Sequence, residues 1–323
     1  MVNSNVDALG IIFPNSRDGV VPELVGERLM ASIPFAGRYR MIDFILSSMV
    51  NSGIRNVSII VRKNYHSLMD HLGSGREWDL TRKNGGLNIV PPFAEKTIKV
   101  YNGRLEALAS ILDFLRDQKE KYVVMSDADI AVNFDFSAMI DAHVKSGADV
   151  TMAYTKEKLP EAVLAERQES TEFYYTLTLD EGRVTGMEIN AKEVDETNFS
   201  MGIYVVEREL LIKQITYAYT HGFVNFERDI LMNQLDKLNV QAYCYEGYIA
   251  RITGMKGYFD ENMRLLEEEN LDALFSPSPI YTKIRDDNPT RYITGAKVEN
   301  IMAADGCVIE GEVENSVLFR GVK

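Results

Sequence analysis

Near its start the sequence has a short apolar run that constrains the fold more than any other segment. Residues 8–13 read ALGIIF and are followed by Pro14 and Asn15. This pattern is typical of a strand that is buried on both faces and ends in a loop. Strands of this kind occur in parallel sheets whose two faces are covered by helices. The run therefore predicts an α/β fold with a loop at the carboxyl end of its first strand.

Helical and strand patterns alternate after this run. Their expected order is helix, strand, helix, helix and strand, at residues 44–52, 56–61, 67–72, 105–118 and 122–126. Such alternation is typical of a doubly wound sheet, in which helices connect parallel strands. The first half of the chain therefore predicts a mostly parallel sheet.

The pattern changes in the second half. After a helix at 137–146 and a strand at 149–154, residues 172–179 and 183–190 flank a turn of the type found in hairpins. A further strand is expected at 199–206, followed by helices at 207–219 and 226–235. We therefore predict that the sheet is mixed, with an antiparallel section.

Two prolines mark the end of this region, in the segment Ser276-Pro277-Ser278-Pro279. They follow a helix expected at 255–270 and suit a linker, because proline fixes φ and has no backbone donor. Beyond them, apolar side chains recur at every sixth residue. These are Ile301, Cys307, Val313 and Phe319. This spacing predicts the rungs of a parallel β-helix, so we expect two domains, residues 1–275 and 276–323, the second of them truncated.

The charge balance and the cysteine content exclude several classes of protein. There are 48 acidic and 35 basic residues, a net charge of −13, whereas a nucleic-acid surface needs clustered Lys and Arg. Two cysteines, Cys244 and Cys307, build neither a disulfide framework nor a thiolate metal site. The first apolar stretch is too short for a membrane span or a signal. We expect a soluble cytoplasmic protein that binds neither nucleic acid nor membrane.

Three segments together are specific for one family. They are FAGRYRMIDF at 35–44, NSGI at 51–54 and SMGIYV at 200–205. On these segments the chain resembles the ADP-glucose pyrophosphorylase (glucose-1-phosphate adenylyltransferase) family, and within it the GlgD-type glycogen-biosynthesis subunits. Catalytic members make ADP-glucose from ATP and glucose 1-phosphate. The resemblance implies a nucleotide-diphospho-sugar transferase type of sheet, followed by the start of a left-handed β-helix.

The loop after the first strand departs from the family's active pattern, GGxGxRL. Here the loop reads Asn15-Ser16-Arg17-Asp18-Gly19-Val20-Val21. Nucleotidyl transfer needs backbone N–H groups and a cation around the triphosphate. Side chains replace the glycines, Asp18 would repel phosphate and Val20 has no guanidinium. Arg17 is then the one cation left in the loop. The alternative is an ordinary surface turn, since Asn, Asp and Gly favour turns.

Three further positions concern phosphate and metal binding. Met30 stands where the family has a lysine, or is simply a core residue. Of the two aspartates that hold Mg²⁺ in the family, one aligns with Asp129, or with Asp127 in a shifted register, and the other with Arg251. An arginine cannot bind Mg²⁺. We expect Arg251 to form an ion pair with Asp127 or Asp129, with contact to a bound phosphate as the alternative.

The sugar-phosphate side resembles the family more closely. Tyr101, Gly103, Glu188 and Ser200 match positions that line its glucose 1-phosphate pocket. The family's GTADA segment reads GRLEA at residues 103–107. Without the resemblance, a lone Tyr or Glu is more simply a packing residue or part of a solvated face.

These departures predict a non-catalytic or weakly catalytic regulatory subunit of glucose-1-phosphate adenylyltransferase. Its expected partner is the catalytic subunit, in a hetero-tetramer or homo-oligomer, with a phosphorylated sugar as candidate effector. No cofactor is expected. The first alternative is an active, divergent nucleotidyltransferase that makes ADP-glucose with Mg²⁺, Arg17 and Asp129 or Asp127. The second is a metabolite sensor without an enzyme partner.

Overall fold

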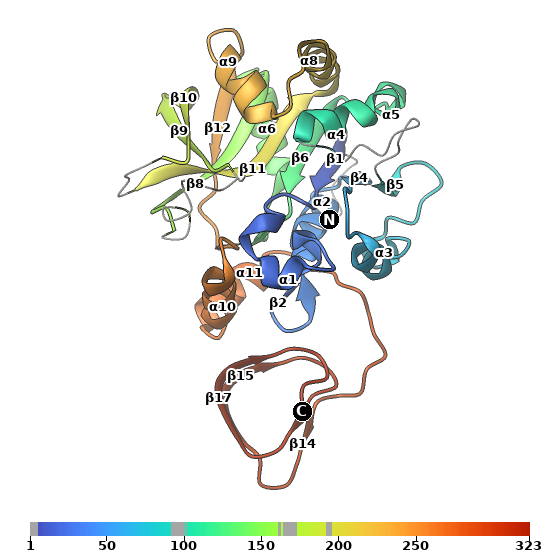
Figure 1. Ribbon diagram of the computed structural model, residues 1–323, viewed down its shortest axis with the longest axis vertical. Coiled ribbons are helices and arrows are strands. Elements are labelled where there is room, and N and C mark those ends of the chain that lie inside the picture. The colour runs from blue at the N-terminus through green and yellow to red at the C-terminus, as the bar shows by residue number, and fades with distance from the viewer. Residues whose placement is uncertain (1–5, 92–100, 102, 161–162, 164–172, 192–195) are drawn as a thin grey trace.

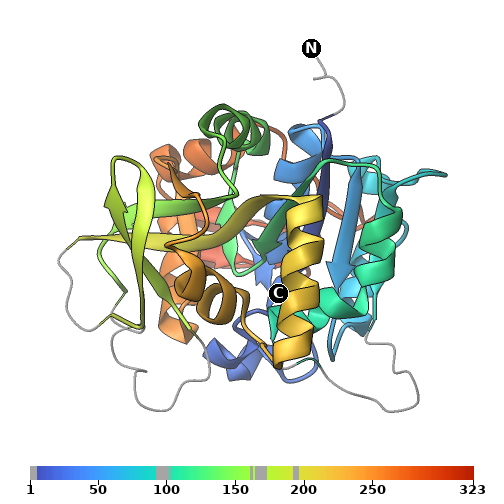
Figure 2. The same ribbon diagram turned by 90° about the horizontal axis from the view of Figure 1, so that it is seen from above.

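The computed structural model describes residues 6–91, 101, 103–160, 163, 173–191 and 196–323. Its larger part is built on a nine-stranded sheet with helices on both sides (Figures 1 and 2). The strands are β1 Ala8–Phe13, β4 Asn56–Ile60, β5 Gly86–Val90, β6 Tyr122–Asp127, β8 Val150–Glu157, β9 Tyr175–Asp180, β10 Arg183–Ile189, β11 Thr197–Glu207 and β12 Val240–Cys244. They lie in the order β5-β4-β1-β6-β11-β8-β12-β10-β9.

The predicted mixture of parallel and antiparallel pairing is confirmed. β1, β4, β5 and β6 pair in parallel, as do β8 and β12. β11 lies between β6 and β8 and runs antiparallel to both. β9 and β10 form the antiparallel hairpin expected around the turn at 180–182. The carboxyl ends of β1, β4 and β6 therefore meet at one edge of the sheet, where the loops that follow them come together.

The helices cover both faces of this sheet. They are α1 Pro22–Val25, α2 Met41–Asn51, α3 His66–Leu72, α4 Arg104–Ser110, α5 Leu112–Asp117, α6 Phe136–Ser146, α8 Arg208–His221, α9 Met232–Gln234, α10 Met255–Arg264 and α11 Glu268–Phe275. Short turns are η1 Asp18–Val20, η2 Met30–Ser32 and η3 Arg76–Trp78, with a π-helix, η4, at Phe226–Leu231. Two-stranded pairs join β2 Pro34–Phe35 to β3 Tyr39–Arg40, and β7 Ile130–Val132 to β13 Ile249–Arg251.

Two expected helices are each broken in two. The helix predicted at 105–118 is interrupted at Ile111, whose backbone (φ −109°, ψ 17°) leaves the helical region. The one predicted at 255–270 ends at Arg264 and resumes at Glu268. Leu265, at the start of the second break, and Leu274, in the helix that follows it, both belong to one hydrophobic cluster. Burial of apolar side chains thus overrides the continuous helical pattern.

The first strand packs into a different hydrophobic cluster on each face, as its apolar run predicts. Ala8 and Ile12 belong to the cluster that includes residues of α2 and α6. Leu9, Ile11 and Phe13 belong to the cluster that includes residues of α4 and α8. All six residues of β1 are buried. The strand is therefore fixed on both sides, and the loop that follows it starts from a rigid support.

The C-terminal region forms a separate coil, at the bottom of Figure 1. Residues 276–290 contain no helix or strand. β14 Arg291–Tyr292 then pairs in parallel with β16 Val308–Ile309, and β15 Lys297–Ala303 with β17 Glu312–Leu318. Parallel pairing agrees with the six-residue spacing, while the left-handed β-helix and the domain boundary at 275/276 stay predictions. Among the described helices, none has the length and apolar character that a membrane crossing requires.

Candidate functional site

A cavity of about 220 Å³ lies at the edge where β1, β4 and β6 end. In open α/β sheets, ligands bind at this carboxyl edge. The lining is rich in charge and carries three guanidinium groups against two carboxylates. These five residues are Arg17, Arg62, Arg104, Asp127 and Glu227. The cavity is therefore a candidate site for an anionic ligand.

The loop after β1 brings Ser16 and Arg17 into this cavity. Arg17 has a left-handed backbone (φ 59°, ψ 31°), which is uncommon for any residue other than glycine. The Ser16 hydroxyl donates to Oδ1 of Asp127 at 2.5 Å. The loop is thus a turn from which Asn15, Ser16 and Arg17 line the cavity.

The remaining loop residues hold the turn in shape. The Asn15 amide donates to Oδ2 of Asp18 at 2.8 Å, and its Oδ1 accepts from the Arg62 backbone N–H at 2.8 Å. Asp18 also accepts from the backbone N–H of Met30 at 2.7 Å, and burial raises the pKa of its carboxyl. Asp18 is not among the residues that line the cavity, and Gly19 is exposed. Asp18 therefore does not face the cavity, and the structure gives no direct support to the expected repulsion of phosphate by this residue.

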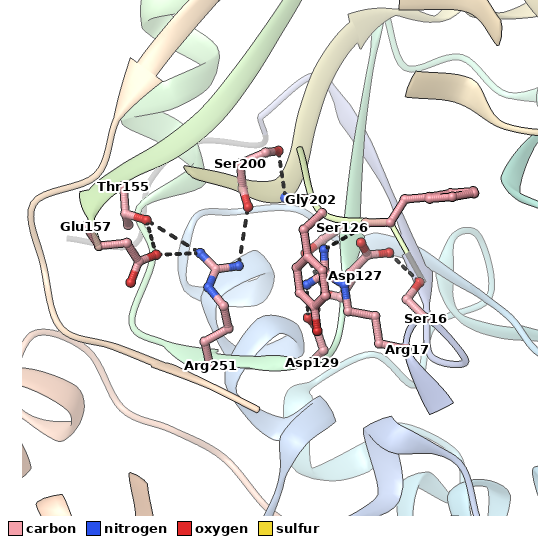
Figure 3. Close-up of polar contacts among 12 residues, drawn as sticks. Ser16, Arg17, Ser126, Asp127, Asp129, Thr155, Glu157, Ser200, Gly202 and Arg251 are labelled. Atoms are coloured by element: carbon pink, nitrogen blue, oxygen red, sulfur yellow. Dashed lines mark hydrogen bonds and ion pairs between the residues drawn. The ribbon is translucent and has the colours of Figure 1, made fainter. Parts of the chain in front are cut away.

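Both candidate metal ligands are paired with arginines. Arg17 forms a buried ion pair with Oδ2 of Asp129, which Figure 3 shows beside Asp127 and Ser16. Arg104 lies 2.6 Å from Oδ1 of Asp127 and forms a second ion pair with Glu227. Each guanidinium neutralises the charge that would otherwise attract a divalent cation. The two aspartates therefore hold the side chains of Arg17 and Arg104 in place.

Arg251 pairs with Glu157 instead of with either aspartate. Its Nη2 lies 3.0 Å from Oε1 of Glu157, and its Nη1 donates to the Ser200 carbonyl at 3.3 Å. Figure 3 shows its side chain directed toward Glu157 and away from Asp129. Arg17 is paired with Asp129, and Arg251 reaches the carboxylate at the end of β8. The ion pair expected from the sequence is thus present with a different partner.

The residues around Asp127 and Asp129 do not fit a Mg²⁺ ion. Mg²⁺ needs carboxylate oxygens in octahedral geometry. Asp127 and Asp129 are both paired with guanidinium groups. Within the described part of the chain, no three His, Cys, Asp or Glu side chains are grouped so that they could hold a metal. One buried oxygen, Oδ1 of Asp129, has no hydrogen-bond partner among the described residues.

Arg104 is the centre of a buried network beneath the cavity. Its guanidinium lies over the rings of Phe13 and Tyr204, with Cζ 4.8 and 5.1 Å from the centroids. The Tyr204 hydroxyl donates to Glu227 at 2.9 Å. Although burial lowers the pKa of Arg104, the charges of Asp127 and Glu227 raise it well above its ordinary value. The arginine therefore stays charged, and it fixes both carboxylates in place.

The four sugar-pocket residues lie at different places. Gly103 and Ser200 line the cavity. Tyr101 is buried in the cluster with α4, and its hydroxyl has no hydrogen-bond partner within the described ranges. Glu188 is exposed on β10 and is not a lining residue. A Cβ at position 103 would lie 2.5 Å from the Val224 carbonyl oxygen, so this site needs glycine.

Val20 and Met30, which the resemblance aligns with an arginine and a lysine, are both core residues. They belong to a hydrophobic cluster that also contains Phe35, Phe44 and Ile252. Met30 is fully buried. Neither lines the cavity. The interpretation of Met30 as a core residue therefore describes its environment.

Sequence reasoning missed two of the cavity's cations. Arg104 occupies the second position of the family's GTADA segment, a difference that was visible in the sequence. Arg62 follows β4 within two residues, so its place at the carboxyl edge was also predictable.

A second basic cavity, of about 230 Å³, lies between the β2–β3 turn and the C-terminal coil. It is lined by Arg38, Arg40, Lys283, Arg285 and Arg320, among others.

Residues 27–249 match the protein family described as Nucleotidyl transferase. Two glycogen biosynthesis proteins named GlgD are similar over nearly the whole chain. The one from Bacillus subtilis (strain 168) is 32% identical over 320 residues, and the one from Geobacillus stearothermophilus is 36% identical over 325. These alignments cover 98% and 99% of this chain and 81% of each relative.

A glucose-1-phosphate adenylyltransferase from Geobacillus stearothermophilus is similar to a comparable degree. It is 32% identical over 297 residues, which are 90% of this chain and 75% of that protein. The two kinds of relative therefore do not differ enough in identity to separate their roles, and the geometry of the cavity has to be weighed as well.

Proposed function

Because the chain belongs to the nucleotidyl transferase family, together with GlgD glycogen biosynthesis proteins and glucose-1-phosphate adenylyltransferases, we propose that it is a regulatory subunit with little or no catalysis of its own. Its α/β domain has the nucleotide-diphospho-sugar transferase fold of that family. Its process is glycogen biosynthesis, and its partner is a catalytic glucose-1-phosphate adenylyltransferase subunit.

One observation supports this proposal above all others. Asp127 and Asp129, at and just after the end of β6, form ion pairs with Arg104 and Arg17, so a divalent cation would have to compete with a guanidinium group at each carboxylate. Transfer of a nucleotidyl group develops charge on the phosphates, and a metal ion normally stabilises that charge. A cavity whose acidic residues are paired with arginines is poorly suited to metal-dependent nucleotidyl transfer. It still has the volume to bind a ligand.

Regulation by such a subunit requires contact with the partner and two conformations of unequal affinity. We assign the contact to a hetero-oligomer, and we take the C-terminal strands as the first rungs of a left-handed β-helix. A phosphorylated sugar is the proposed effector. The second basic cavity, where Arg38, Arg40 and Arg320 gather, has the charge that an effector phosphate needs.

The test is an assay of ADP-glucose synthesis by three preparations: this chain, a catalytic homologue, and the two together after co-expression. The expected result is background activity for the chain alone and a changed kcat or KM for the mixture. Size-exclusion chromatography with light scattering should show a mixed oligomer. Unchanged kinetics and separate elution of the two proteins would rule out the regulatory role.

One feature favours the alternative of a divergent active enzyme. Oδ1 of Asp129 is buried and lacks a hydrogen-bond partner among the described residues, so part of one acidic ligand is still available. Under this alternative, the purified chain alone would release pyrophosphate from ATP and glucose 1-phosphate in a Mg²⁺-dependent manner. Arg17 would then have to move away from Asp129 when substrates bind.

A further inference from the structure

The guanidinium of Arg17 is enclosed at the position where a cation is needed beside Asp129. The two side chains are 7% and 0% exposed, and they form an ion pair. Cζ of Arg17 lies 4.2 Å from the centroid of the Tyr174 ring, which adds a cation–π contact. Its Nη2 also donates to the Phe173 carbonyl at 3.5 Å. The positive charge is therefore a fixed part of the cavity wall.

Arg62 supplies a second charge, which interacts electrostatically with Asp18 but forms no ion pair within the described ranges. Its Nη2 donates to the Asn15 carbonyl at 2.9 Å and its Nη1 to the Tyr101 carbonyl at 3.2 Å. These bonds fix the guanidinium without cancelling its charge. No carboxylate of the described residues forms an ion pair with Arg62, whereas Arg17 and Arg104 each have carboxylate partners. Among the guanidinium groups that line the cavity, Arg62 is therefore the one without an ion-pair partner in the described part of the chain.

We propose that Arg17 replaces the divalent cation beside Asp129, and that the cavity consequently binds a sugar phosphate without any metal ion, with Arg62 as its main phosphate-binding group. The inference rests on the proposed function in one respect: it takes the chain to bind its ligand without turning it over. It adds the cavity in which a sugar phosphate binds, the residues that hold it and the independence from metal.

The size and the polar lining agree with a ligand of this class. A cavity of about 220 Å³ is smaller than the 300–1,000 Å³ that is typical of sites for drug-sized ligands, so a sugar phosphate suits it better than a whole nucleotide sugar. Ser200 and Asn225 line the same cavity and offer hydrogen bonds to sugar hydroxyls. Arg62 matches the bidentate geometry of a phosphate group.

The same geometry explains why a metal would not enter. A divalent cation at Asp129 would have to displace a buried guanidinium and leave that charge without a carboxylate partner. Asp127, the other candidate ligand, is likewise held by a guanidinium group, that of Arg104. Removing the Arg17 side chain should allow a divalent cation to bind Asp129, because both carboxylate oxygens then become available.

The first experiment measures binding of glucose 1-phosphate to the full chain by isothermal titration calorimetry, once with EDTA and once with Mg²⁺. Inorganic phosphate and ATP serve as further probes. The expected result is the same Kd for glucose 1-phosphate with and without Mg²⁺, with weaker binding of inorganic phosphate. A Kd that improves tenfold or more with Mg²⁺, tighter binding of ATP than of glucose 1-phosphate, or no binding at millimolar concentration would each overturn the proposal.

Two variants test the assigned residues. Arg62→Ala should weaken binding in EDTA by at least tenfold, while the control Arg116→Ala, which removes an exposed arginine on α5, should leave the Kd unchanged. Arg17→Ala should weaken binding in EDTA and acquire Mn²⁺ binding, measured by electron paramagnetic resonance. The added change Asp129→Asn should abolish this Mn²⁺ binding. Unchanged affinity in Arg62→Ala, or no Mn²⁺ binding by folded Arg17→Ala, would contradict the assignment.

Circular dichroism verifies that each variant is folded. If Arg17→Ala does not fold, Arg17→Gln is measured in its place, and the result for Arg62→Ala decides the proposal by itself. The binding experiments use this chain alone, whereas the regulatory role is tested with a catalytic partner. A mixture with altered kinetics but no metal-free binding would refute this inference and leave the regulatory role intact, and the converse result would do the opposite.

Discussion

The backbone of Gly202 lies directly against the carboxylate of Asp127, so that a Cβ at position 202 would overlap Oδ2 and lie 3.1 Å from Cγ. Gly202 has φ +69° on β11, where its N–H donates to the Ser200 hydroxyl at 3.3 Å. The close approach keeps the Asp127 carboxylate in the position from which it binds Arg104 and Ser16. The position of the Asp127 carboxylate in the cavity thus depends on glycine at residue 202.

Gly202→Ala should therefore destabilise the protein by about 2–4 kcal/mol, through the strained φ and the overlap with Asp127. The matched control is Gly222→Ala, since Gly222 also has φ +69° but a Cβ at that position would meet nothing within 4 Å. It should cost only about 1 kcal/mol. Urea denaturation of both variants measures the difference. Equal losses would show that the contact with Asp127 is not important.

Met30→Lys, which introduces the lysine that the resemblance predicts at this position, should not create phosphate binding. Met30 is fully buried in the cluster with Phe35 and Phe44, and a lysine there would place a charge among apolar side chains. The expected loss of stability is about 3 kcal/mol or more. Met69→Lys is the control, because Met69 is 45% exposed on α3 and should change stability by less than about 0.5 kcal/mol. Thermal unfolding compares them.

The sequence predicted those features of the fold that follow from local patterns. The apolar run 8–13 predicted a strand buried on both faces, and the turn at 180–182 predicted the hairpin of β9 and β10. The breaks at Ile111 and after Arg264 were not predictable in this way, because contacts with distant residues decide them.

The same limit applies to the candidate site. The departures from the glycine loop could be found from the sequence alone, whereas the partner of each charge could not. Arg251 was expected to pair with Asp127 or Asp129, but the two arginines that hold these aspartates come from the loop after β1 and from α4. Charges pair according to their positions in space, and several arginines could reach the same carboxylates. Spacing along the chain does not distinguish among them.

Glu261 should make stability depend on pH. Burial raises the pKa of its carboxyl to about 7, with Arg264 opposing and Glu157 adding to the shift. Between about pH 4.5 and pH 7 the folded state then binds more protons than the unfolded state, so the free energy of unfolding falls as the pH rises through this window. The contribution is about 1–3 kcal/mol.

Glu261→Gln removes this titration. Relative to the unmodified protein, the variant should gain stability as the pH rises from 5 to 8, as measured by urea denaturation at several pH values. Glu268→Gln, on the exposed side of α11, is the control and should give a difference that does not vary with pH. A parallel offset at all pH values for Glu261→Gln would mean that its carboxyl has an ordinary pKa.

Arg251→Asp tests whether the acidic pair of the family can be restored by one change. The new carboxylate would face Glu157, which loses the partner that now lies 3.0 Å away, while Arg17 and Arg104 would still hold Asp129 and Asp127. We therefore expect a loss of stability of about 3–5 kcal/mol and no gain of Mg²⁺-dependent ADP-glucose synthesis.

Arg251→Gln is the matched control, because it removes the charge without adding a carboxylate. The double variant Arg17→Gly, Arg251→Asp should differ, since it frees Asp129 as well. Measurable synthesis by Arg251→Asp alone would show that the arginine at position 251, and not the pairing of Asp129 with Arg17, is what closes this site to metal.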